Sequence, residues 1–157
     1  MSERQKIVNI FLDERSVIRR SPQVEHERKV AIFDLLEENH FAPIGDFSGP
    51  YNLHLGIEDN RLVFDVRDSE DRNLTKFTLP VSSFRSIVKD YFMVCESYFA
   101  AIKKSSPSQI EAIDMGRRGL HNEGAQILRE RLEGKIDIDV GTSRRLFTLI
   151  CVLHIRA

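Results

Sequence analysis

The stretch YNLHLGIEDNRLVFDVRDSEDRNLTKFTLP, residues 51–80, decides the fold class. Apolar residues occupy alternate positions in successive short runs, which is the period of a strand with one buried face. Polar turns at 58–60 and 69–73 separate the runs. Because strands joined by short turns usually pair with each other, the stretch predicts a three-stranded antiparallel meander.

The period changes to that of a helix directly after this meander. Between 84 and 102, apolar residues recur at spacings of three and four along one stripe. This predicts a helix of about 20 residues, roughly 30 Å long. We expect it to cross the sheet and to bury its aromatic side there, in a core shared with the apolar helix near the C-terminus.

The flanking segments supply the remaining elements. A β-branched run predicts a strand at 7–12, and helical spacing after Ser21-Pro22 predicts a helix to about Glu38. Ile136, Ile138 and Val140 alternate with polar residues over a last short strand. Together these patterns predict an α+β fold: a small antiparallel sheet of about three to four strands, packed against about four to five helices that lie mainly in the C-terminal part.

The helices after residue 105 carry recognisable start and stop signals. Ser106, Pro107 and Gln109 predict a capping box. Since a glycine inside a helix costs about 1 kcal/mol relative to alanine, the glycines at 116, 119 and 124 predict a break near Leu120. A second piece should end at Gly134, and Thr142 or Ser143 should cap a final helix that reaches about His154.

Composition predicts one cytoplasmic domain over residues 1–157. The chain is 41% hydrophobic and 30% charged, with a formal net charge of −1. That charge gives no field to attract nucleic acid, so no nucleic-acid partner is expected. No membrane partner is expected either, because the N-terminus does not have the pattern of a signal peptide and no apolar run is long enough for a span. Cys95 and Cys151 lie in apolar runs and are predicted to be buried, reduced thiols.

One segment, residues 114–124, is predicted to do more than build the scaffold. It places charged and ionisable groups among three glycines. Arginine forks match carboxylates and phosphates, so an anion site is one interpretation. Its candidate residues are Arg117, Arg118, His121, Asn122 and Glu123.

Two other interpretations of this segment stay open. The one that the sequence favours is structural: Arg117 or Arg118 pairs with Asp114 or Glu123 to hold two helices together, and the glycines permit close helix approach. The other is an exposed patch for a protein partner. His121-Asn122-Glu123 also matches half of a zinc-deaminase signature, but the required cysteine pair is absent.

No catalytic motif assigns a reaction. The sequence has no nucleophile elbow, phosphate-binding loop or dinucleotide fingerprint. The histidines at 26, 54 and 154 are scattered, and each is typical of a surface or a helix end, so neither a metal nor another cofactor is expected. The catalytic residues, if there are any, are unknown.

Four stretches carry a resemblance to a known family: 24–28 (VEHER), 87–93 (IVKDYFM), 107–124 and 145–154. On these stretches the chain resembles a family of uncharacterised bacterial proteins found mainly in alphaproteobacteria. The resemblance spans nearly the whole chain. It implies a stand-alone intracellular protein, and it carries no activity, substrate or cofactor.

The function therefore remains open between two classes. The sequence favours a small non-enzymatic regulatory or adaptor protein with a protein partner. The alternative is a protein that binds, or a small enzyme that acts on, a phosphorylated or carboxylated small molecule through the Arg117, Arg118 and His121 group. Whether the chain is an enzyme, and its oligomeric state, are not decided by its residues.

Overall fold

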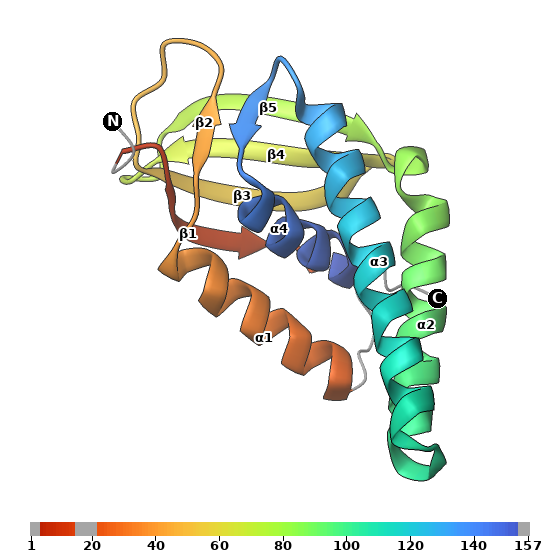
Figure 1. The fold of residues 1–157 in the computed structure, drawn as a ribbon. Coiled ribbons are helices and arrows are strands. Elements are labelled where there is room, and N and C mark those ends of the chain that lie inside the picture. The colour runs from red at the N-terminus through yellow and green to blue at the C-terminus, as the bar shows by residue number, and fades with distance from the viewer. Residues whose placement is uncertain (1–3, 15–21, 154–157) are drawn as a thin grey trace.

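A computed structural model describes residues 4–14 and 22–153 of the protein (Figure 1). The main sheet has four strands in the order β1-β3-β4-β5. Its strands are β1 (Ile7–Leu12), β3 (Tyr51–Glu58), β4 (Arg61–Asp68) and β5 (Asn73–Pro80). The predicted meander from β3 to β5 is confirmed, with both turns at the expected places.

The sheet is mixed rather than purely antiparallel, because β1 pairs parallel to β3. A parallel pair needs a long crossover connection. Helix α1 (Pro22–Glu37) and strand β2 (Phe41–Pro43) lie within that connection. The predicted strand at 7–12 and helix at 22–38 are thus confirmed almost to the residue, but the direction of pairing was not apparent from the sequence.

A second sheet of two strands joins distant parts of the chain. Strand β2 pairs antiparallel with β6 (Ile136–Ile138). Both ends of β2, Phe41 and Pro43, are buried. No strand was predicted here, since a strand of three residues is too short to show a period.

The helix that covers the sheet is α4 (Val140–Leu153), not α2 (Arg85–Lys104) as predicted. Helix α4 lies between α1 and α3 (Pro107–Leu132), and every residue from Leu146 to Leu153 is buried (Figure 1). Its apolar side chains occupy the space that α2 was expected to fill. Helix α2 follows the short helix η1 (Val81–Ser83), starts at the sheet and then runs beside α3 as an antiparallel hairpin (Figure 1).

The predicted shared core is present, with the distal part of α2 less buried than expected. Tyr91 and Cys95 belong to the same apolar cluster as the side chains of α4. Phe92 and Phe99 are only partly buried against this cluster. Cys95 and Cys151 are both buried free thiols.

The predicted break near Leu120 is wrong, because α3 is one continuous helix. Gly116 and Gly119 are exposed, so each only weakens the helix without interrupting its hydrogen bonds. At Gly124 the ring of Phe147 packs onto the helix, and this packing outweighs the low helix propensity of glycine. The capping box of Ser106 and Gln109 at its start is confirmed.

The predicted caps of α4 are also wrong. The carboxylate of Asp139 accepts a hydrogen bond from the backbone N–H of Thr142 at 2.8 Å, which makes Asp139 the capping residue. Thr142 instead accepts a bond from the N–H of His40, and Ser143 donates to the carbonyl of Val140. The predicted end of the helix at His154 lies outside the described residues. Within the described ranges, no helix is long and apolar enough to cross a membrane.

Candidate functional site

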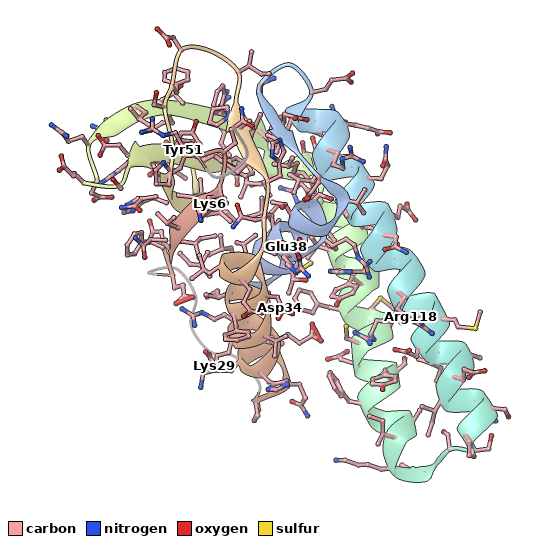
Figure 2. The ribbon with its side chains drawn as sticks, turned by 60° about the vertical axis from the view of Figure 1, so that its left-hand side comes forward. Lys6, Lys29, Asp34, Glu38, Tyr51 and Arg118 are labelled. Carbon is pink, nitrogen blue, oxygen red and sulfur yellow. The ribbon has the colours of Figure 1, made fainter. Side chains whose placement is uncertain are left out.

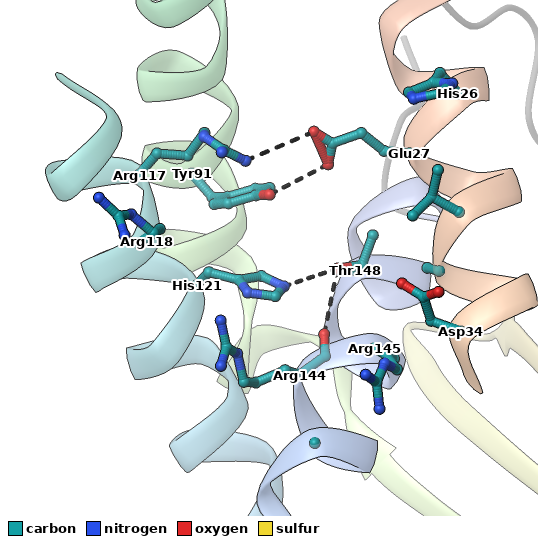
Figure 3. Close-up of a pocket in the computed structure, with 13 residues that line it drawn as sticks. His26, Glu27, Asp34, Tyr91, Arg117, Arg118, His121, Arg144, Arg145 and Thr148 are labelled. Atoms are coloured by element: carbon teal, nitrogen blue, oxygen red, sulfur yellow. Dashed lines mark hydrogen bonds and ion pairs between the residues drawn. The ribbon is translucent and has the colours of Figure 1, made fainter. Parts of the chain in front are cut away.

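A cavity of about 510 Å³ opens between α1, α3 and α4 (Figure 3). Its volume lies within the range of small-ligand pockets, about 300–1,000 Å³. Its wall combines several charged side chains with few apolar ones. The lining residues are His26, Glu27, Val30, Ala31, Asp34, Tyr91, Arg117, Arg118, His121, Gly141, Arg144, Arg145 and Thr148.

Each helix supplies one stripe of side chains to this cavity. Helix α3 contributes Arg117, Arg118 and His121, and α4 contributes positions 141, 144, 145 and 148. Residues three and four apart lie on the same side of a helix, so these spacings bring the side chains of each stripe together. Helix α1 forms the opposite wall with positions from 26 to 34.

Arg117 ties three helices together. Its guanidinium donates two hydrogen bonds to one carboxylate oxygen of Asp114, at 3.1 and 2.7 Å. It lies 3.9 Å from the carboxylate of Glu27 on α1 and stacks over the ring of Tyr98 on α2, 5.0 Å from its centre. Burial lowers the pKa of Arg117, but the hydrogen bond to Asp114 and the nearby negative groups outweigh burial and raise this pKa above its usual value. The guanidinium of Arg117 is thus already engaged by side chains of the protein.

His121 is a neutral imidazole in a half-buried position. Its Nε2 is hydrogen-bonded to Oγ1 of Thr148 at 2.7 Å, and its ring packs 5.6 Å from that of Tyr91. Burial lowers the pKa of His121 to about 4, and the positive charges of Arg144 and Arg117 act in the same direction. The hydroxyl of Thr148 also donates to the carbonyl of Arg144 at 3.2 Å, which ties the imidazole to the backbone of α4.

The arginines of α4 have spare binding capacity. Among the described residues, the guanidinium groups of Arg144 and Arg145 make no ion pair. Arg145 lies close enough to act on Asp139, the residue that caps this helix. Burial raises the pKa of Asp139, but hydrogen bonds from Thr142 and the charges of His40 and Arg145 bring it below its usual value.

Arg118 adds a third positive group to this wall. Its Nε lies 3.2 Å from the carboxylate of Asp114, which also pairs with Arg117. The side chain of Arg118 is 56% exposed, so its fork remains accessible from the cavity. One carboxylate thus serves two arginines, and the wall formed by α3 and α4 is positive.

The wall formed by α1 is negative. The carboxylate of Glu27 accepts a hydrogen bond from the hydroxyl of Tyr91 at 3.3 Å and lies near Arg117. Asp34, two turns along the same helix, is half-buried at the edge of the cavity (Figure 3). In the part of the chain that the structure describes, its carboxylate makes no hydrogen bond or ion pair.

Three of the five residues predicted for the anion site line the cavity. These are Arg117, Arg118 and His121. Asn122 and Glu123 are exposed and do not line it. On the unbroken helix, each further residue turns the side chain by about 100°, so position 123 points away from the stripe of 117, 118 and 121, and position 122 lies just beyond its edge, next to Arg118. The binding role of all five residues stays a prediction.

The structural interpretation of the segment holds in part. Arg117 and Arg118 both pair with Asp114, whereas no described basic residue pairs with Glu123. Only Gly124 permits close helix approach, because a Cβ atom at 116 or 119 would meet nothing within 4 Å. Neither Gly116 nor Gly119 lines the cavity.

Sequence reasoning missed most of the other lining residues. Arg144 and Arg145 had a signal, a basic pair at the start of an otherwise apolar helix. Glu27, Asp34 and Thr148 had none, because only the tertiary fold brings them to α3. His26, which the sequence assigned to an exposed turn, is exposed at the edge of the cavity. The described residues hold no group of three or more metal-ligating side chains.

The chain was also compared with known proteins. The model of the uncharacterised protein family UPF0262 matches residues 4–156. A UPF0262 protein of Paramagnetospirillum magneticum is 67% identical, over 99% of both chains. Others from Rhodospirillum rubrum and Rhizobium leguminosarum are 63% and 56% identical, over 96% of this chain and 92% and 96% of theirs. No solved structure matches. The chain therefore belongs to the UPF0262 family, which has no assigned function.

Proposed function

We propose that the protein binds a small phosphorylated or carboxylated molecule in the cavity between α1, α3 and α4. The observation that carries this proposal is the pair of guanidinium groups of Arg144 and Arg145, which face a 510 Å³ cavity with no ion-pair partner among the described residues. Unpaired arginine forks beside a cavity are the groups that recognise carboxylates and phosphates.

The neighbouring groups support the same ligand chemistry. Arg118 lies on the same wall with its fork half exposed. His121 is neutral over the physiological range because its pKa is about 4. A neutral imidazole recognises an anion through a hydrogen bond rather than a charge, and a bound anion would raise the pKa of this ring. Gly141 brings the first turn of α4 to the wall of the cavity, where the helix dipole favours an anion.

An adaptor role is a second candidate, and α1 carries the observation that favours it. Phe33 is 64% exposed and Leu36, three residues later, is 40% exposed. The two side chains form a small apolar area to which a protein partner could dock. Isolated exposed apolar side chains are common on soluble proteins, whereas several unpaired charges that line one cavity are not. Ligand binding is thus the function that the geometry supports better, and a regulator that responds to such a ligand would combine both roles.

We place this activity in the cytoplasm. The support is that Cys95 and Cys151 are free, buried thiols, as is usual in a reducing compartment.

Calorimetric titration with inorganic phosphate and with acetate tests the proposal. The wild type should bind at least one of the two, and Arg144→Gln/Arg145→Gln should lose at least about tenfold in affinity, since each loses a charge-assisted contact. Arg131→Gln, an exposed arginine of α3 outside the cavity, is the matched control and should bind like the wild type. The proposal is contradicted if the wild type binds neither anion, or if the double variant binds an anion with the same affinity as the wild type.

A further inference from the structure

The two walls of the cavity carry unpaired groups of opposite charge. Figure 2 shows Asp34 on α1 and Arg118 on α3, two helices that face each other across the cavity. The carboxylate of Asp34 has no hydrogen-bond or ion-pair partner within the described ranges. Arg144 and Arg145 project from α4 in the same condition, Arg144 toward α3 and Arg145 toward α1 (Figure 3). An anion alone would satisfy only one of these walls.

The other charges of the cavity are already engaged. Arg117 is bound by Asp114 and Glu27, and Arg118 shares Asp114. Glu27 also accepts the hydroxyl of Tyr91. The groups that remain for a ligand are therefore the guanidinium groups of Arg144 and Arg145 and the carboxylate of Asp34, beside the half-exposed fork of Arg118 and the exposed imidazole of His26.

From this arrangement we infer that the ligand is a zwitterion, a small molecule with a protonated amine and either a phosphate or a carboxylate. The inference rests on the proposed function and deepens it. The anionic group would lie on Arg144 and Arg145, and the amine would donate to Asp34. A neutral hydroxyl at that place would leave the half-buried carboxylate without a counter-charge, so an ammonium group is the better partner.

The surroundings of the cavity limit what else the ligand can carry. An apolar gap beyond Glu27 and Tyr91, lined by Cys95, Phe99 and Cys151, has a volume of only about 20 Å³. That is room for about one water molecule. An acyl chain or an aromatic ring does not fit there. Because this gap adds no apolar subsite, we expect a compact polar ligand, such as an amino acid or an aminoalkyl phosphate.

Two matched pairs of probes test the inference by calorimetry. Phosphoethanolamine and ethyl phosphate share the phosphate and differ by the amine, and β-alanine and propionate are the corresponding carboxylates. In at least one pair, the wild type should bind the amine-bearing probe at least about tenfold more tightly. Asp34→Asn should reduce this ratio to about two or less, while its affinity for the probe without an amine stays the same or rises.

Glu37→Gln is the control, because Glu37 is an exposed carboxylate of α1 that does not line the cavity. It should keep the full ratio. If all four probes fail to bind, both the proposed function and the zwitterion are refuted. If neither amine-bearing probe binds more tightly than its partner, or if Asp34→Asn keeps the ratio, the zwitterion is refuted while anion binding stands.

Discussion

The ring of Phe147 on α4 packs directly onto the backbone of Gly124 on α3, so that a Cβ atom added at Gly124 would overlap with the ring. Phe147 is fully buried. The close approach of α3 and α4, and with it the width of the cavity, depends on the missing side chain at this position.

We expect Gly124→Ala to lower the free energy of unfolding by up to about 2 kcal/mol. Alanine favours a helix by about 1 kcal/mol, but overpacking against a buried ring costs about 1–3 kcal/mol. Gly116→Ala and Gly119→Ala are the matched controls, and each should stabilise the protein by up to about 1 kcal/mol, because nothing lies within 4 Å of the added atom. Urea unfolding of the three variants would measure these differences. A Gly124→Ala variant as stable as the other two would contradict the helix packing.

The low pKa of His121 predicts a stability that falls with acid. The unfolded imidazole takes up a proton near pH 6.5, whereas the folded one does so only near pH 4. Between these values the unfolded state binds more protons, so stability is full above about pH 6.5 and decreases as the pH falls toward 4. From pH 7 to pH 5, the wild type should lose about 2 kcal/mol more than His121→Gln, which lacks the titrating group. Equal losses in the two proteins would show that the ring is not desolvated in this way.

Arg117 and Arg118 should differ sharply in their contribution to stability. Arg117→Gln removes the bonds to Asp114 and the contact with Glu27, and should cost about 1–3 kcal/mol. Arg118→Gln removes a pair whose arginine is 56% exposed, and should change stability by about 0.5 kcal/mol or less. Thermal unfolding of both variants checks this order, and a reversed order would overturn the structural role given to Arg117.

Both cysteines should resist a disulfide reagent in the native protein. Burial raises the pKa of the Cys95 thiol to about 11, and the nearby charge of Glu27 acts in the same direction. Burial also raises the pKa of Cys151 well above its usual value. Since the thiolate is the reactive form, labelling should be slow until the protein is unfolded in urea, when both thiols react. Rapid labelling of either residue without denaturant would contradict their burial.

The elements of this fold that were predictable from sequence are those with local signals. The meander of β3, β4 and β5 follows from alternation and polar turns, and the start of α3 follows from the capping box at Ser106. The parallel pairing of β1 with β3 and the short sheet of β2 and β6 were not predictable, because they depend on contacts between distant segments. The continuity of α3 through Gly124 likewise depends on Phe147, a residue of another helix.

The candidate site shows the same limit. Arg117, Arg118 and His121 were identifiable because they lie within one turn of one helix. Asn122 was included because it follows Arg118 by four residues, the spacing of neighbours on a helix, but neither Asn122 nor Glu123 lines the cavity. Asp34 and Arg145 reach the cavity from segments that are distant in the sequence, and no local pattern connects them.

The most direct test of ligand binding in this cavity is the change in backbone amide chemical shifts when inorganic phosphate is added to isotopically labelled protein. The titration should extend to about 20 mM, where a millimolar site would be nearly saturated. We predict saturable shifts centred on Gly141, Arg144, Arg145 and His121, with none in the meander of β3 to β5. No saturable shift at these four residues, or shifts confined to another surface, would contradict the proposal that this cavity binds an anion.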